Sequence, residues 1–278
     1  ETDRSAEGGN DMSYTYQAGF IGAGNMGGAL ALAAAKTAGG EQIAISCSTA
    51  DSTAAAAERL GCAAETPARI LRGSRFVFLG MKPQMLDYVM APLAADVAGS
   101  DAIFVSMLAG VRIERLQKLL GAEKKIIRIM PNTPCAVGEG VILLCRGAGV
   151  TDGEAAEFRA LMAHSGLLDE IPETQIDAAS AVAGCGPAFA YLFVEALADG
   201  GVACGLPRAK AQRYAAQMLL GSAAMVLQSG KHPGLLKDEV CSPGGSTIAG
   251  VHALERGAFR NACFDAVEAA YRKTTQLG

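Results

Sequence analysis

Residues 17–28 read Gln-Ala-Gly-Phe-Ile-Gly-Ala-Gly-Asn-Met-Gly-Gly, and this stretch decides the fold of the chain. A short apolar strand runs directly into a glycine-rich turn, and the alanine-rich segment 29–38 that follows has high helix propensity. In such a loop the first glycine permits a tight turn, the second lets a pyrophosphate approach, and the third allows close packing of helix on strand. The stretch predicts a dinucleotide site whose cofactor-binding residues are Gly22, Gly24, Asn25, Met26 and Gly27.

Short apolar segments alternate with helical ones through the first half of the chain. The pattern predicts further strands at residues 43–47, 75–80, 102–106 and 125–129, and a late strand at 141–145. This alternation is typical of an α/β fold with a parallel, doubly wound sheet of the Rossmann type.

The pattern changes near residue 151, where Thr-Asp-Gly-Glu is a helix-start signal for a helix at 155–165. After Asp177 no strand signal remains, and helices are expected at 187–202, 208–228 and 246–257, with a last one ending at 273. We therefore expect a disordered leader at 1–16, a dinucleotide-binding Rossmann domain at 17–173 and an all-helical domain at 174–278. Met12 is a candidate native start.

The end of the second expected strand bears on the choice of cofactor. An NAD site usually carries an Asp or Glu there that binds the ribose. This chain instead has Ser46-Cys47-Ser48-Thr49, with no carboxylate before Asp51, so hydroxyl donors such as Ser48 are available to a 2′-phosphate. Although no arginine is present to hold that phosphate, the segment favours NADP(H) over NAD(H).

Three later segments leave their strands at the same edge of the expected sheet. Met107-Leu-Ala-Gly-Val contains residues small enough for a nicotinamide ring to lie flat against them, whereas Asn132 either bonds the cofactor or fixes its proline-flanked turn. The further cofactor-binding residues predicted from these segments are Met81, Lys82, Pro83, Ala109, Gly110 and Asn132.

A second glycine-rich turn, Ser242-Pro-Gly-Gly-Ser-Thr247, precedes an expected helix far from the first. Glycines let backbone N–H groups face outward together, and a helix N-terminus adds positive potential, so the turn predicts a site for a small carboxylate. Helix capping by Ser246 and Thr247 is the alternative reading. His232 and His252 lie outside the turn and are poor candidates for a general acid.

Composition excludes several classes of function. The net charge is -4, and no basic stripe interleaved with aromatics indicates nucleic-acid binding. The eight cysteines form no C-x-x-C pair and the three histidines are scattered, so no metal is expected. Cysteines spread through apolar segments, with no secretory signal in view, indicate a reduced, cytoplasmic protein.

The longest uncharged run, residues 178–194, approaches the length of a membrane span. It contains Gly184, Gly186 and Pro187, and Glu195 and Asp199 follow it, so a turn and a buried helix are expected instead of a span. Residues 188–194 are apolar on every face. Because such a helix must be enclosed and this helical domain is small, the sequence predicts an obligate homodimer. Glu195 and Asp199, four residues apart on one helix face, are expected to complete a hydrogen-bond network at that interface.

Taken together, these segments resemble the pyrroline-5-carboxylate reductases over nearly the whole chain, from Phe20 to about Arg272. The resemblance rests on FIGAGNMG at 20–27, FLGMKPQ at 78–84, RIMPNTP at 128–134, GCGPAFAYLFVEALADGG at 184–201, SGKHP at 229–233 and LKDEVCSPGGSTIAG at 236–250. It implies reduction of 1-pyrroline-5-carboxylate to proline with a nicotinamide nucleotide. It also implies a helical domain that dimerises and holds the substrate, with dimers often gathered into rings.

The resemblance also implies roles for the second turn. Gly245, Ser246 and Thr247 would offer backbone N–H groups to the substrate carboxylate, Val240 and Ser242 would shape the pocket, and the Thr247 hydroxyl would bond the imine nitrogen as the catalytic residue. A threonine hydroxyl is a poor acid, so we expect Thr247 to orient the imine more than to protonate it.

Two positions depart from the family pattern. Where this chain has Ala183 the family usually has Ser, and where it has Glu239, near the cofactor, the family commonly has Asn. Glu239 would place a carboxylate there and bears on nucleotide preference. Two other functions remain open: reduction of another cyclic imine or a hydroxyacid on the same architecture, and non-catalytic regulation by a protein that binds NADP.

Overall fold

The structure is a computed structural model that describes residues 14–276 of the chain. The chain divides into two compact units: unit 1 runs to Ser180 and takes up the chain again from Thr274, and unit 2 is Ala181–Lys273. The leader expected at 1–16 lies mostly outside the described residues, and the first strand begins at Tyr16.

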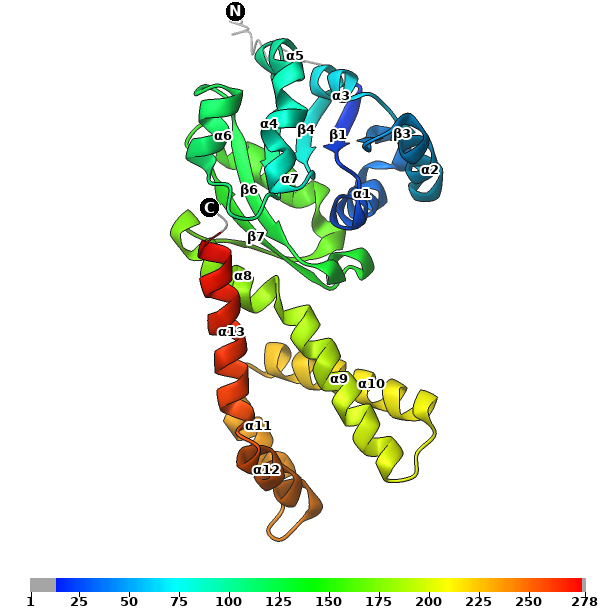
Figure 1. Ribbon diagram of the computed structural model, residues 1–278, viewed down its shortest axis with the longest axis vertical. Coiled ribbons are helices and arrows are strands. Elements are labelled where there is room, and N and C mark those ends of the chain that lie inside the picture. The colour runs from blue at the N-terminus through cyan, green and yellow to red at the C-terminus, as the bar shows by residue number, and fades with distance from the viewer. Residues whose placement is uncertain (1–13, 277–278) are drawn as a thin grey trace, which may run out of the picture. The chain divides into compact units, whose positions relative to one another are not determined.

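Unit 1 is built on one eight-stranded sheet with the order β3-β2-β1-β4-β5-β6-β7-β8 (Figure 1). Strand β7 is antiparallel to β6, whereas the other neighbouring pairs are parallel. The first six positions follow the Rossmann order, which places the ligand crevice outside the carboxyl ends of β1 and β4. The strands are β1 (Tyr16–Ile21), β2 (Ile43–Ser46), β3 (Ala63–Ala64), β4 (Ser74–Leu79), β5 (Ile103–Ser106), β6 (Ile126–Pro131), β7 (Gly140–Arg146) and β8 (Gly166–Glu170).

Helices cover both faces of this sheet. Side chains of α1, α2 and α7 share one hydrophobic cluster with it, and side chains of α3, α4, α5, α6 and α8 share the other. Phe20 and Phe78 stack in the first cluster with ring centroids 4.2 Å apart. The helices are α1 (Asn25–Ala38), α2 (Ala50–Leu60), α3 (Pro67–Gly73), α4 (Leu86–Met90), α5 (Ala94–Ala98), α6 (Ile113–Leu120), α7 (Asp152–Leu161) and α8 (Ile176–Ala183), the last crossing the division between the units.

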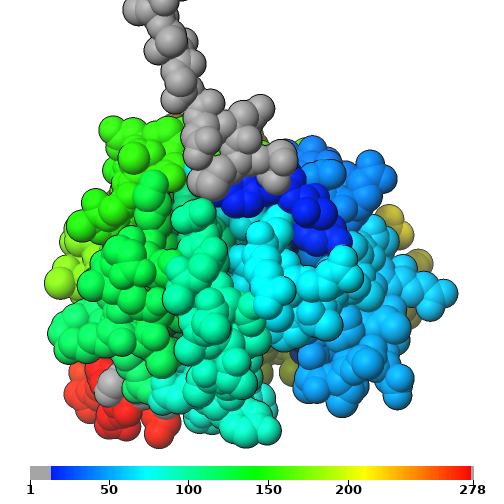
Figure 2. All heavy atoms as spheres, turned by 90° about the horizontal axis from the view of Figure 1, so that it is seen from above, coloured from blue at the N-terminus to red at the C-terminus, as the bar shows by residue number. Residues whose placement is uncertain are grey.

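Several elements differ from expectation. The helix expected at 155–165 ends at Leu161, and Ala163–Ser165 forms a separate 3-10 turn. Strand β8 was not expected because this edge strand pairs only with β7, has no buried residue and includes Asp169 and Glu170 in its sequence. Viewed from above in Figure 2, the dark blue β1 segment emerges between lighter blue and cyan segments, which follows its central place in the sheet.

Unit 2 contains helices and no strand among the described residues. They are α9 (Gly186–Ala203), α10 (Arg208–Ser229), α11 (Pro233–Val240), α12 (Ser246–Arg256) and α13 (Phe259–Thr275), whose last residues belong to unit 1. The buried hydrophobic residues described in unit 2 are four alanines, whereas large side chains such as Tyr191 and Leu192 are about two-thirds exposed. A single copy therefore gives these helices almost no core.

One helical run in the described part of the chain, Glu173–Ala203, is long and apolar enough to cross a bilayer by length and composition. It is not continuous, because α8 ends at Ala183 and α9 begins at Gly186. Only 11% of its most apolar window is buried.

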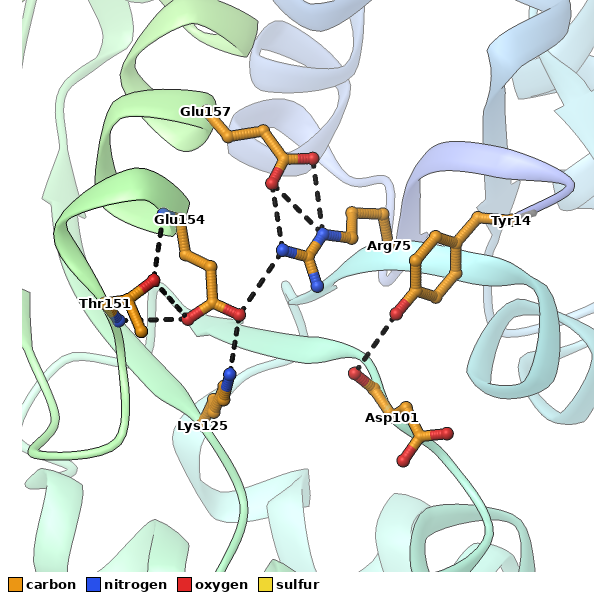
Figure 3. A network of polar contacts seen from close by, with 7 residues as sticks. All are labelled: Tyr14, Arg75, Asp101, Lys125, Thr151, Glu154 and Glu157. Carbon is orange, nitrogen blue, oxygen red and sulfur yellow. Dashed lines mark hydrogen bonds and ion pairs between the residues drawn. The ribbon is translucent and has the colours of Figure 1, made fainter. Parts of the chain in front are cut away.

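A polar network joins the first turn of α7 to the amino ends of β4 and β6 (Figure 3). Glu154 accepts hydrogen bonds from Lys125 at 2.7 Å and from the backbone N–H of Thr151 at 2.9 Å. Arg75 donates to Glu157 at 2.9 Å and to Glu154 at 3.3 Å. Burial opposes ionisation of Glu154, but the bonds from Lys125 and Thr151 outweigh it and lower the pKa of this carboxyl to about 2.

Glu154→Gln should therefore destabilise the protein in a pH-dependent way. A carboxyl whose pKa falls on folding contributes stability above its ordinary value of 4.5, and this contribution is lost as the pH falls toward 2. We expect a loss of about 1–3 kcal/mol at pH 7, shrinking below pH 4.5, in chemical denaturation. The exposed Glu41→Gln should change little at either pH, and a Glu154→Gln penalty equal at pH 7 and pH 3 would contradict this account.

Candidate active site

The glycine-rich loop between β1 and α1 is shaped by backbone packed against backbone. Gly22 has φ +104°, and a Cβ there would lie 2.6 Å from the carbonyl carbon of Gly80, at the end of β4. A Cβ on Gly27 would collide with the carbonyl oxygen of Gly22. The N–H of Gly22 donates to the Ser46 carbonyl at 2.8 Å, which ties the loop to the end of β2. Glycine is thus required at positions 22 and 27 by packing alone.

Gly24 has a different role, because a Cβ built there meets nothing within 4 Å. Gly24 is the N-cap of α1. No side chain caps this helix, and its first turn contains no acidic residue. The first N–H groups of α1, from Asn25 to Gly27, therefore have no partner within their own helix. An open backbone at a positive helix end fits the pyrophosphate of a dinucleotide.

The end of β2 presents hydroxyl groups and no carboxylate from Ser46 to Thr49. Thr49 caps α2 by accepting from the Ser52 N–H, and Ser48 is exposed beside it. Asp51 lies in the first turn of α2. Between Ser46 and Thr49 no carboxylate is present that would repel an anionic substituent on a ribose.

The loops after β4 and β5 border a common cavity of about 700 Å³. Three predicted cofactor residues, Pro83, Ala109 and Gly110, line it. The neighbouring Met81 is half-buried and Lys82 is exposed. Sequence reasoning did not include Arg112, Arg115 and Lys118, basic residues at the start and on the exposed side of α6 that also line the cavity. The sequence signal that could have identified them is that they belong to the N-cap and the helix that follow Gly110.

Asn132 is buried, and its side-chain oxygen accepts a hydrogen bond from the Val141 N–H at 2.9 Å. This bond holds the turn after β6 against the start of β7, so the structure shows the turn-fixing role that the sequence left as one of two possibilities. A contact between Asn132 and a cofactor stays a prediction.

The second glycine-rich turn links α11 to α12 within unit 2. Its N-cap is Gly245, whose N–H donates to the Ser242 carbonyl at 3.0 Å, and no side chain caps α12. Ser246 and Thr247 are the first two helical residues, so the alternative reading of these residues as caps is wrong. The N–H groups of Ser246, Thr247 and Ile248 have no intrahelical partner, which suits them to bind a carboxylate.

The other residues around this turn have identifiable roles. Val240 and Ser242 are exposed, and a Cβ on Gly245 would collide with the Ser242 hydroxyl. His232 caps α11 by accepting from the Gly234 N–H at 3.0 Å, which is a structural role. Glu239 pairs with Lys231 at 2.7 Å, so its charge is balanced within unit 2.

The described residues contain no group of three or more His, Cys, Asp or Glu placed to hold a metal ion. The geometry therefore presents, in each unit, a helix N-terminus whose N-cap is a glycine and which no side chain caps. The first suits a dinucleotide and the second suits a small carboxylate.

Comparison with known proteins gives a family match for each part of the chain. Residues 173–277 match the family model described as pyrroline-5-carboxylate reductase dimerisation, and residues 17–110 match one described as NADP oxidoreductase coenzyme F420-dependent. Pyrroline-5-carboxylate reductase 3 of Danio rerio is 41% identical over 95% of this chain and 92% of its own length. The pyrroline-5-carboxylate reductase of Escherichia coli is 38% identical over 93% and 97%.

A solved structure of pyrroline carboxylate reductase from Plasmodium falciparum with NADP bound is similar as well. It has 31% sequence identity and a TM-score of 0.85, with coverage of 95% of this chain and 99% of that one.

Gly24→Ala tests the dinucleotide loop without disturbing the fold. Because an added Cβ meets nothing within 4 Å, the free energy of unfolding should change by less than about 1 kcal/mol. The methyl group would occupy space that the pyrophosphate needs, so we expect the Kd for a nicotinamide nucleotide to rise about 10-fold or more. Titration calorimetry measures both the variant and a control, Gly99→Ala, at a helix end with φ -82°. Equal affinities in both variants and the wild type would contradict the assignment.

Proposed function

The chain belongs to the pyrroline-5-carboxylate reductase family, and from that premise we propose its preferred nucleotide, the residues that bind cofactor and substrate, and its assembly. The enzyme reduces 1-pyrroline-5-carboxylate to L-proline by hydride transfer from a nicotinamide nucleotide, which is the last step of proline biosynthesis. The observation that carries the two binding sites is the glycine N-cap of α1 and of α12, where no side chain caps the helix.

We propose that NADP(H) is preferred over NAD(H). The hydroxyl groups at residues 46–49 and the lack of a carboxylate there support this choice, because a carboxylate would repel a 2′-phosphate. Glu239, the acid that departs from the family pattern, is neutralised by Lys231 and does not oppose it. The related Plasmodium falciparum enzyme was solved with NADP bound.

In this proposal unit 1 holds the cofactor. Gly24 and the first N–H groups of α1 receive the pyrophosphate, with Ser48 beside the ribose. Met81, Lys82 and Pro83 after β4 and Ala109 and Gly110 after β5 border the nicotinamide. When bound, that ring supplies the hydride.

The N-terminus of α12 in unit 2 would hold the substrate carboxylate. Backbone N–H groups of Ser246 and Thr247 are suited to two carboxylate oxygens. The N–H of Gly245, which the family resemblance also assigned to the carboxylate, is already donated to the Ser242 carbonyl, and this bond closes and preorganises the turn. Hydride transfer requires the reacting atoms to approach within roughly 3–3.5 Å. In the assembled enzyme, the substrate held at the carboxylate site and the cofactor held at the nicotinamide edge must therefore be the pair that reacts.

Thr247 is the one side chain of this turn that we assign to the imine nitrogen. An imine that arrives protonated needs an acceptor to orient it and no acid. A threonine hydroxyl can accept from that N–H, whereas its proton is poorly acidic. We therefore propose orientation as its principal role.

Thr247→Ala should lower kcat by at most about 10²–10⁴-fold, the contribution expected of an assisting group. Thr247→Ser keeps the hydroxyl and should restore most of the activity, and the exposed Thr275→Ala serves as a control. Steady-state assays give kcat, and proline binding measured separately reports whether the turn is intact. A far larger loss with proline binding preserved would show that the hydroxyl is the essential acid.

We propose that the chain assembles as a homodimer, because unit 2 has almost no hydrophobic core in a single copy. Rings of dimers are proposed from the family resemblance. Leu192, Leu227 and Phe264 are 67%, 82% and 78% exposed in the single chain. A second copy covering such helices would bury the apolar surface that one copy leaves in water. We propose that this partner, and not a bilayer, covers the run Glu173–Ala203, and the match to the dimerisation model across 173–277 supports it.

Leu192→Arg should convert the oligomer to monomers, because it puts a charge into the proposed interface. Light scattering after gel filtration measures the mass. Leu119→Arg, at an exposed leucine of α6 in unit 1, should leave the mass unchanged. A wild-type protein that is monomeric at micromolar concentration would contradict the proposal.

The specificity constants for two substrates and two nucleotides test the function as a whole. We expect kcat/KM to be higher for 1-pyrroline-5-carboxylate than for six-membered cyclic imines, and higher with NADPH than with NADH. Faster turnover of the larger ring would favour another cyclic-imine reductase. Nucleotide binding without NADPH oxidation would favour the alternative of a non-catalytic regulator that binds NADP.

All eight cysteines of the chain are free thiols in the structure. We propose that the protein works in a reducing compartment, the cytoplasm.

A further inference from the structure

Arg128 is a fully buried arginine in the sheet, with 1% of its side chain exposed. It lies in β6 between Ile127 and Ile129, which belong to one hydrophobic cluster, while Ile126 and Met130 belong to the other. Because side chains alternate along a strand, Arg128 shares the face of Ile126 and Met130. A buried guanidinium is stable only where acceptors surround it.

Two carboxylates provide those acceptors. Glu173 accepts from Nη1 of Arg128 at 3.0 Å, and Asp177 accepts from Nη2 at 3.4 Å. Glu173 opens a 3-10 turn and Asp177 lies in the first turn of α8, the helix that crosses from unit 1 into unit 2. Nε of Arg128 has no partner among the described residues, so the guanidinium depends on these two acids.

The same oxygen of Glu173 also accepts the backbone N–H of Ile113 at 2.8 Å. Ile113 begins α6, and the N-cap residue Arg112 makes no side-chain cap. A carboxylate 60 residues away in sequence therefore caps this helix. Its charge is also favoured by the positive end of the helix dipole.

The segment that leads into α6 contains Ala109 and Gly110, which line the cavity at the nicotinamide edge. Gly110 has φ +74° and allows the chain to turn into the helix. The Glu173 carboxylate thus fixes the end of this loop through the Ile113 N–H. Arg128, which binds Glu173, also binds Asp177 in the first turn of α8.

We propose that Arg128, Glu173 and Asp177 form a positioning clamp that fixes the 109–110 loop at the cofactor edge together with the first turn of α8. The inference rests on the proposed placement of the nicotinamide beside that loop. None of the three residues is assigned a contact with cofactor or substrate; they act through the α6 N-terminus.

Loss of the Glu173 carboxylate should weaken nucleotide binding beyond its effect on stability. Glu173→Ala removes both the helix cap and the partner of Arg128, whereas Glu173→Gln keeps an uncharged acceptor for the Ile113 N–H. We expect the Kd for NADPH, followed by its fluorescence, to rise about 10-fold or more in the alanine variant and by a smaller factor in the glutamine variant. Arg128→Lys, which cannot reach both acids with the same geometry, should also raise it.

Glu157→Ala is the matched control. It breaks an arginine–glutamate pair of unit 1 at the opposite, amino edge of the sheet, where Arg75 donates at 2.9 Å. We expect a smaller fall in Tm, because Glu157 is 40% exposed and Arg75 keeps Glu154 as a partner, and a Kd for NADPH that stays within about two-fold of wild type. If Glu173→Ala fails to fold, Glu173→Gln provides the comparison.

An unchanged Kd in the Glu173 variants, or an equal rise in Glu157→Ala, would overturn the clamp. The proposed function is judged separately on the wild-type enzyme. A wild type that binds neither NADPH nor NADH would contradict the proposed function. A preference for NADH would contradict only the cofactor choice, and the Kd values of the clamp variants would then be compared for NADH.

Discussion

The close backbone contact between Gly22 and Gly80 is the constraint on which unit 1 depends. Neither residue has room for a Cβ, and the Gly80 N–H donates to the Ile21 carbonyl at 2.9 Å. This contact brings the ends of β1 and β4 together and directs the chain from β1 into α1. The crevice of a Rossmann sheet lies outside the carboxyl ends of these two strands, where the strand order reverses, so the contact shapes the loop at the expected cofactor site.

The two ligand sites follow one physical principle. A helix that begins without a side-chain cap leaves backbone N–H groups for a ligand, and both α1 and α12 begin on such a residue, Gly24 and Gly245. At α6 the corresponding groups are instead capped by Glu173 from within the protein. The contrast separates the two helix ends that we propose as ligand sites from one whose N–H is bonded within the protein.

Much of unit 1 could be predicted from the sequence because its strands are short apolar runs between glycine-rich turns. The direction of β7 could not be, because an apolar strand next to β6 has the same pattern in either orientation. The Arg128–Glu173 pair was also missed. An arginine within an apolar strand was the visible signal, but no local rule identifies an acid 45 residues later as its partner. In the second turn the helix start expected at residue 246 is confirmed, whereas the N-cap is Gly245 and not one of the hydroxyl residues.

The central claim is that a dinucleotide binds at the N-terminus of α1 and a carboxylate at the N-terminus of α12. A crystal structure of the enzyme with NADP⁺ and proline tests it most directly. The account predicts the pyrophosphate over Gly24 and the proline carboxylate on the backbone N–H groups of Ser246 and Thr247. A proline carboxylate held elsewhere, with the α12 N-terminus facing only solvent, would contradict it.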